Sequence, residues 1–309
     1  MNIQSEINKL NLFSNLELLA NQVVEGFISG MHKSPFHGFS SEFAEHKIYN
    51  RGESTRHIDW KRFAKTEKLY VKKYEEETNL RCHLIIDNSS SMHYPAMKRQ
   101  SVTEYNKIGF SVLAAGALMT LLKRQRDAVG LSVYSDDYEF YASEKGSDRH
   151  FHQLMTALEG LSEPAGYGKP THTYTFLHQI AEKIHRRSMI FVFTDMFQTE
   201  TDKSRLFSAL QHLKYNKHEV ILFHVMDKAS EYHFDFDNTP RRFTDVETGE
   251  VIDLFAENVK SAYEKKVATY VNDIRLTCAK YRIKYVEADI SKDLNKILYT
   301  YIIERQKFV

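Results

Sequence analysis

From Cys82 to the C-terminus, short apolar runs alternate with longer segments in which apolar residues recur every three or four positions. Short runs bounded by turn residues predict β-strands, and the longer periodic segments predict amphipathic helices. The first, fourth and fifth runs are apolar almost throughout, as expected for strands buried on both faces of a sheet. The six predicted strands are Cys82–Asp87, Val129–Tyr134, Tyr138–Ala142, Met189–Thr194, Val220–Val225 and Lys284–Ala288.

Helices are predicted between these strands, and this alternation implies a mostly parallel sheet with helices on both sides. The sequence therefore predicts an α/β fold with a doubly wound, mostly parallel six-stranded sheet of Rossmann-type topology. The helix after the first strand is expected to begin at a capping box formed by Ser101 and Glu104 and to end near Arg126. The other predicted helices are Asp148–Leu161, Tyr174–His185, Asp202–Tyr215, Phe255–Tyr281 and Lys292–Gln306.

The first 80 residues have a different pattern, with a predicted helix over Ser14–Ile28 followed by extended segments such as Lys68–Tyr74. We expect this N-terminal helical and extended part, residues 1–80, to pack on a main domain formed by residues 81–309. Within that domain, residues 231–254 interrupt the strand–helix alternation. Their alternating aromatic residues predict a small β-hairpin inserted after the fifth strand.

Composition is that of an ordinary globular protein, with 42% hydrophobic and 27% charged residues in a chain of 309. The formal net charge of +1 does not indicate a nucleic-acid partner or an anionic membrane surface. The N-terminal residues lack the basic and apolar regions of a signal peptide, and the apolar run Phe110–Leu122 is too short to span a membrane. Two cysteines argue against a disulfide framework or a structural zinc site. These features predict a cytoplasmic protein without a membrane span.

The candidate chemistry begins where the first predicted strand ends, in the sequence Asp87-Asn88-Ser89-Ser90-Ser91. Its D-x-S-x-S spacing alone is more typical of a plain turn, because Asp and Ser are common turn residues. In a doubly wound sheet, however, the first and fourth strands are neighbours, and ligands bind beyond their carboxyl ends. The fourth predicted strand is followed by Asp195. Two aspartates are therefore expected to meet at this edge, with the hydroxyl groups of Ser89 and Ser91 between them.

A loop before the fourth strand's crossover helix offers one more hydroxyl group, from Thr171 or from Thr173, which is also a candidate N-cap of that helix. Oxygen ligands of this kind suit Mg²⁺ or Mn²⁺. Five such ligands would leave one coordination position open and carry at most two negative charges, so the ion would attract an acidic side chain of a partner protein. The predicted metal ligands are Asp87, Ser89, Ser91, Thr171 and Asp195.

This site predicts binding rather than catalysis, because the sequence contains no evident base or charge stabiliser beside it. Neither a G-x-G-x-x-G nor a Walker A motif is present, which argues against a dinucleotide-binding enzyme and a P-loop ATPase. The alternative is a metal-dependent phosphatase or hydrolase with Asp87 as nucleophile. Phosphotransferases of the haloacid dehalogenase type need D-x-D, and here Ser89 replaces the second aspartate. A third hypothesis is a degenerate site without metal, with partners recruited by the surface alone.

The five predicted ligands resemble the metal-ion-dependent adhesion site of von Willebrand factor type A domains. The segment Tyr49–Lys61, which contains Ile58-Asp59-Trp60, resembles more closely the family named domain of unknown function 58, and this resemblance extends from about Phe39 to the C-terminus. It implies a von Willebrand factor A-like fold. It also implies association with a MoxR-type AAA+ ATPase in chaperone-like or complex-assembly activity.

Overall fold

The computed structural model describes residues 10–31, 46–48, 63, 69–72, 80–135, 138–162, 173–196, 200–237, 239–245, 249–292 and 294–308. The chain divides into two compact units. The larger unit consists of residues 1–27 and 79–309, and the smaller unit consists of residues 28–78.

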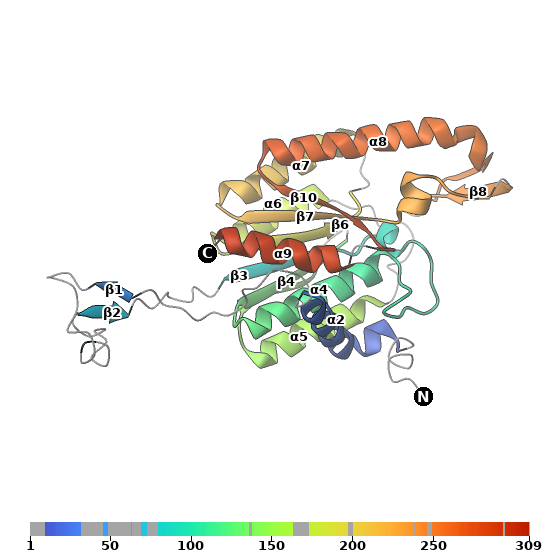
Figure 1. Ribbon diagram of the computed structural model, residues 1–309. Coiled ribbons are helices and arrows are strands. Elements are labelled where there is room, and N and C mark those ends of the chain that lie inside the picture. The colour runs from blue at the N-terminus through green and yellow to red at the C-terminus, as the bar shows by residue number, and fades with distance from the viewer. Residues whose placement is uncertain are drawn as a thin grey trace. The chain divides into compact units, whose positions relative to one another are not determined.

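The larger unit is built on a six-stranded sheet with the order β10-β7-β6-β3-β4-β5 (Figure 1). All neighbouring strands are parallel except β5, which is antiparallel to β4. Each of the six predicted strands is confirmed, and so is the mostly parallel sheet. The strands are β3 (Arg81–Asp87), β4 (Ala128–Tyr134), β5 (Tyr138–Lys145), β6 (Met189–Thr194), β7 (Glu219–Met226) and β10 (Lys284–Asp289).

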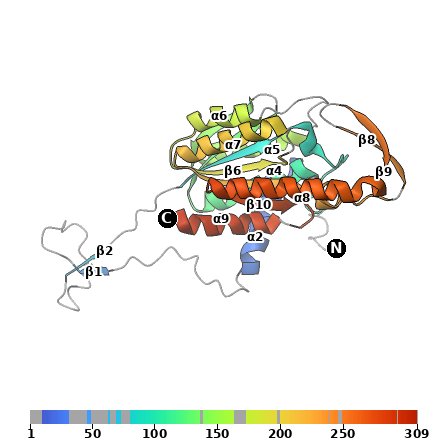
Figure 2. The same ribbon diagram turned by 90° about the horizontal axis from the view of Figure 1, so that it is seen from above.

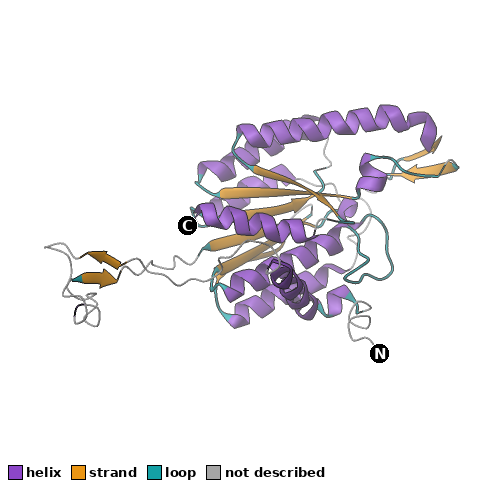
Figure 3. Cartoon of the chain, viewed as in Figure 1, coloured by secondary structure: helices purple, strands orange, loops and turns teal. Residues whose placement is uncertain are grey.

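Helices cover both faces of this sheet (Figure 2; Figure 3). One face packs against α6 (Thr173–Lys183), α7 (Glu200–Tyr215) and α8 (Ala256–Lys280). The other face is covered by α4, α5 and α9, and α2 lies outside α4, where Leu16 packs closely against Gly116. These helices are α2 (Leu16–Met31), α4 (Lys107–Arg124), α5 (Asp148–Glu159) and α9 (Leu294–Phe308).

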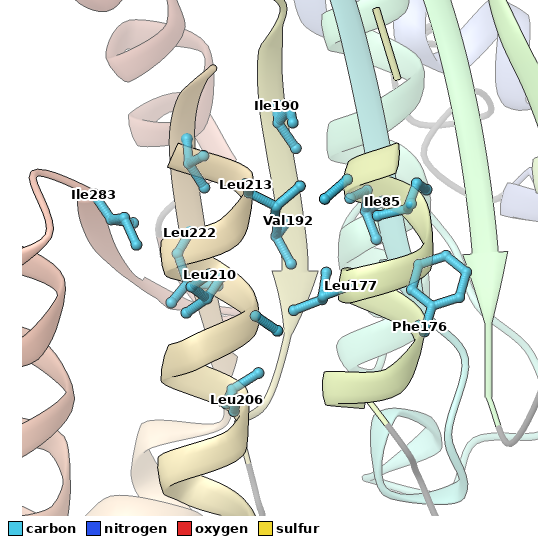
Figure 4. Packing of buried hydrophobic residues seen from close by; sticks show 14 of the residues in the cluster. Ile85, Phe176, Leu177, Ile190, Val192, Leu206, Leu210, Leu213, Leu222 and Ile283 are labelled. Atoms are coloured by element: carbon cyan, nitrogen blue, oxygen red, sulfur yellow. The ribbon is translucent and has the colours of Figure 1, made fainter. Parts of the chain in front are cut away.

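The central strands β3 and β6 are buried on both faces, and their side chains alternate between the two helical layers. Ile85, Ile190 and Val192 contribute to the core beneath α6 and α7 (Figure 4). Phe191 contacts the opposite layer, where its ring centroid lies 5.9 Å from that of Tyr301 on α9. Burial on both faces is the physical reason that these strands are apolar throughout and could be predicted from sequence.

Helix α4 begins later than predicted. Asn106 is its N-cap and accepts a hydrogen bond from the backbone N–H of Gly109 at 3.0 Å. Ser101 instead accepts from the N–H of Glu104 at 3.2 Å in a separate turn, so the expected capping box does not start the helix. The Ser-x-x-Glu spacing stabilises a local turn here, and the helix starts only where the apolar run of α4 follows.

The predicted insertion contains a hairpin, formed by β8 (Pro240–Thr244) and β9 (Val251–Phe255). Its first residues are not part of the hairpin, because residues Lys228–Tyr232 form a short π-helical turn. In the smaller unit, β1 (His46–Ile48) pairs antiparallel with β2 (Tyr70–Lys72), which lies inside the predicted extended segment.

Most of residues 32–79 lie outside the described part of the chain, so the predicted packing of residues 1–80 on the main domain stays a prediction. The remaining described elements are three short 3-10 helices, Leu12–Ser14, Ser90–His93 and Gly160–Ser162. Among the described helices, none combines the length and the apolar character that crossing a membrane requires.

Candidate metal centre

The loop after β3 holds Asp87 in a fixed position. The backbone N–H of Ser89 donates to Asp87 Oδ1 at 3.0 Å, which is the local turn that an Asp at a strand end favours. Thr194, the last residue of the neighbouring strand β6, donates its hydroxyl group to Asp87 Oδ2 at 2.8 Å. Both carboxylate oxygens are therefore oriented by the protein, and the side chain is almost completely buried.

The two predicted serine ligands lie side by side. Ser89 is the N-cap of the 3-10 helix Ser90–His93, yet its side chain makes no capping hydrogen bond. Its Oγ lies 3.1 Å from Ser91 Oγ, and both serines are buried. Adjacent ligand oxygens around an octahedral Mg²⁺ are also about 3 Å apart, given metal–oxygen distances of about 2.1 Å. The serine pair is thus spaced as two neighbouring ligands of one ion need to be.

Asp195 lies beside Asp87, as the predicted strand order requires. Strands β3 and β6 are adjacent and parallel, and Asp195 directly follows β6. Burial, followed by the negative charge of Asp195, raises the pKa of Asp87 to about 6. The structure therefore brings together Asp87, Ser89, Ser91 and Asp195, the four predicted ligands that it describes.

Thr171 lies outside the described residues, and so does the side chain of Thr173, the first residue of α6. The identity of the threonine ligand therefore stays a prediction.

Two further charged residues belong to this centre and were not predicted. Lys107 Nζ donates to Asp195 Oδ2 at 2.9 Å and to Glu231 Oε1 at 2.5 Å. The Lys107 side chain is 1% exposed and that of Glu231 is 14% exposed. Burial lowers the pKa of Lys107, but the charges of Asp195 and Glu231 outweigh burial and hold it above its ordinary value. Lys107 is therefore a permanently charged ammonium group inside the protein.

The position of Lys107 is informative only once the structure shows where α4 begins, because the sequence predicted an earlier start. Lys107 is the first residue of α4, and a cation at a helix N-terminus is opposed by the helix dipole. A lysine in that position needs an acidic partner to offset the unfavourable placement. The sequence did not indicate which carboxylates would serve, because Asp195 and Glu231 are distant in the chain. Glu231 was predicted to belong to the inserted hairpin, whereas it lies in the partly buried turn before it.

Carboxylates outnumber ammonium groups among the described contacts of the centre. Asp87, Asp195 and Glu231 contribute three negative charges when ionised, and Lys107 contributes one positive charge. No ion pair to Asp87 is formed by a described residue. In the contacts that the structure describes, one ammonium group faces these three carboxylates, and a divalent cation would add positive charge to the cluster. Carboxylate and hydroxyl oxygens are also the donors that Mg²⁺ and Mn²⁺ prefer, so these residues fit the ion that the sequence predicts.

The centre differs from sites made of charged or imidazole ligands alone. Within the described ranges, no group of three or more His, Cys, Asp or Glu side chains is arranged to hold a metal ion. The candidate centre has two carboxylates in ligand positions and depends on serine hydroxyl groups for the remaining described donors. Such a set of oxygen donors favours a hard cation such as Mg²⁺ or Mn²⁺ over Zn²⁺, which prefers nitrogen and sulfur ligands.

The fold and the centre define a class of protein: an α/β domain with a candidate oxygen-ligand cation site at the carboxyl edge of its sheet, where strand order reverses. The chain belongs to the family described as protein of unknown function DUF58, whose model matches residues 45–272.

Curated relatives carry no assigned function in their names. The uncharacterized proteins Rv1480 of Mycobacterium tuberculosis and Mb1516 of Mycobacterium bovis are each 24% identical to the chain over 152 residues. The match covers 49% of this chain and 46% of each relative, so the chain spans about half the length of the curated relatives it matches.

Solved structures give distant similarities. The conserved hypothetical protein BatB from Bacteroides thetaiotaomicron is 17% identical with a TM-score of 0.45, and covers 74% of this chain and 99% of its own. An aerotolerance-related membrane protein from Bacteroides fragilis is 16% identical with a TM-score of 0.43, and covers 73% of this chain and 99% of its own. These low TM-scores support no functional conclusion.

Proposed function

We propose that this chain is a non-enzymatic, metal-dependent protein-binding module with a von Willebrand factor A-like fold. The observation that carries the proposal is the buried group at the ends of β3 and β6. Asp87 and Asp195 lie there beside a pair of serine hydroxyl groups. Lys107, which contacts both Asp195 and Glu231, is the ammonium group that pairs with these carboxylates. A bound divalent ion is the simplest way to balance this group.

The ion would be Mg²⁺ or Mn²⁺, held by Asp87, Ser89, Ser91 and Asp195 together with Thr171, and it would supply a positive charge for a partner's carboxylate. The protein's own residues prepare the centre. Thr194 and the backbone of Ser89 fix the Asp87 carboxylate, and Lys107 neutralises part of the charge on Asp195. Because of Lys107, the ion would keep more of its own positive charge for the partner.

Catalysis is the less supported alternative. A nucleophilic Asp87 needs a free oxygen that can reach a substrate. Asp87 is only 1% exposed, and Ser89 stands where a phosphotransferase of the haloacid dehalogenase type needs its second carboxylate. A phosphatase screen with Mg²⁺ in which Asp87→Asn abolishes turnover would favour the enzyme over the binding module.

The partner we propose is a protein that offers an acidic side chain to the centre. The family resemblance implies a MoxR-type AAA+ ATPase as its class, with chaperone-like or complex-assembly activity as the process and the cytoplasm as the compartment.

Affinity purification tests this proposal, with the wild-type chain, Asp87→Ala and the loop control Ser90→Ala as baits. In Mg²⁺ we expect wild type and Ser90→Ala to retain the same partner, and EDTA to release it. Asp87→Ala is expected to retain about tenfold less, since a metal ligand is lost. Equal retention by all three baits, unaffected by EDTA, would favour the degenerate site without metal.

A further inference from the structure

A cavity of about 580 Å³ lies between α8 and the carboxyl ends of β6 and β7, next to the candidate metal centre. Asp195 lines both the cavity and the centre, and Glu231 lines the cavity while contacting Lys107. A group that enters this cavity therefore comes close to the predicted ion. Figure 1 shows α8 running along the sheet from the insertion that contains β8.

The cavity wall is mainly apolar and aromatic. The hydroxyl group of Tyr263 donates to the backbone carbonyl of Glu231 at 2.9 Å, and that of Tyr270 donates to the carbonyl of Met196. Because these polar ends are satisfied by the backbone, the rings serve as apolar wall. A cavity of this size and character accommodates a bulky uncharged group. Its apolar and aromatic lining residues are Met226, Tyr232, Tyr263, Val267, Tyr270 and Val271.

The charged groups divide into an inner wall and an outer rim. The inner wall carries Asp195 and Glu231, which disfavour an anionic group inside the cavity. The rim carries Lys265, Lys266 and Asp273, all exposed on α8, with a net positive charge. An acidic segment is therefore attracted to the outside of the cavity, and an uncharged side chain is favoured within it.

We infer that the cavity binds a bulky apolar side chain of the same partner segment whose acidic side chain completes the metal centre. The partner is then an acidic segment with an aromatic or large aliphatic residue near its metal-binding carboxylate. This inference rests on the proposed function, because it needs the ion at Asp87 and Asp195. The cavity adds specificity that a carboxylate alone does not provide, since many acidic surfaces offer a carboxylate.

Calorimetric titration with 1-naphthaleneacetate tests the inference, because this probe joins one apolar ring system to one carboxylate. The full chain is titrated in Mg²⁺ and in EDTA. We expect the wild type to bind about tenfold more tightly in Mg²⁺. Val267→Trp narrows the cavity and is expected to weaken binding about tenfold or more in both conditions. Leu276→Trp, at a 60% exposed position on the same helix, is the matched control and should bind as wild type.

A second variant avoids any effect of Val267→Trp on folding. The exposed pair Lys265→Glu/Lys266→Glu should weaken the probe several-fold, whereas Lys280→Glu at the end of α8 should not. Wild-type affinity in both Val267→Trp and the rim variant, with Mg²⁺ dependence intact, would overturn the inference and leave the proposed function standing. Binding that both variants weaken but Mg²⁺ does not change would support the cavity and contradict the proposed function.

Discussion

Replacement of Lys107 by methionine is expected to lower the free energy of unfolding by about 3–5 kcal/mol, the range for breaking a buried ion pair. Methionine keeps the length of the side chain but removes the charge that contacts Asp195 and Glu231. Two carboxylates then remain buried beside Asp87 without that ammonium group. Urea unfolding in EDTA, followed by circular dichroism, measures the loss.

Two variants control for this effect. Lys123→Met changes a partly exposed lysine of the same helix, which pairs with the exposed Asp148, and should cost no more than about 1 kcal/mol. The double variant Lys107→Met/Glu231→Gln removes one of the stranded charges and should recover part of the stability. If Lys107→Met unfolds at the same urea concentration as Lys123→Met, the ion pairs of Lys107 with Asp195 and Glu231 do not contribute the expected stability.

Asp87→Asn is expected to stabilise the fold in metal-free buffer at pH 7, in contrast to Lys107→Met. The gain is at most about 3 kcal/mol, because asparagine can accept only one of the two hydrogen bonds that Asp87 accepts. The folded-state pKa of Asp87 is about 6, raised by burial and by Asp195. An ionised Asp87 is thus less favourable in the folded than in the unfolded chain. This cost is absent below the unfolded pKa near 4, grows as pH rises, and is complete above about pH 6. Asparagine carries no charge, so its advantage should appear over the same range.

Unfolding curves in EDTA at pH 4, 5, 6 and 7 measure this advantage against wild type. Asp148→Asn, at a side chain that is 81% exposed, is the control and should show no comparable change. Added Mg²⁺ should stabilise the wild type more than Asp87→Asn, because a neutral amide oxygen is a weaker ligand for Mg²⁺ than a carboxylate. A stability difference that stays constant from pH 4 to pH 7 would contradict the assigned charge imbalance.

The sheet and the meeting of the two aspartates were predictable for one physical reason. Strands buried on both faces, such as β3 and β6, must be apolar throughout, and a doubly wound order makes them neighbours. The proximity of Asp87 and Asp195, which end or follow these two strands, is a direct consequence of that order. The predicted start of α4 was wrong because Ser101 and Glu104 form a local turn instead of a helix cap. The Ser-x-x-Glu spacing alone does not distinguish a capping box from such a turn.

The electrostatic partners of the centre could not be predicted, because they depend on tertiary contacts. Lys107 meets Asp195 across 88 positions of sequence and Glu231 across 124, and Thr194 meets Asp87 across 107. Each partner alone has an ordinary local explanation, as a helix end, a loop carboxylate or a strand residue. Their combination matters chemically, since it determines how much charge is left for an ion.

Isothermal titration of Mg²⁺ into the metal-free chain at pH 7 tests the central claim most directly, with Asp87→Ala as the comparison. We predict that the wild type binds one Mg²⁺ per chain and that Asp87→Ala, with an unchanged circular dichroism spectrum, binds none. No binding heat with the folded wild type, or equal binding by Asp87→Ala, would contradict a metal centre at the ends of β3 and β6.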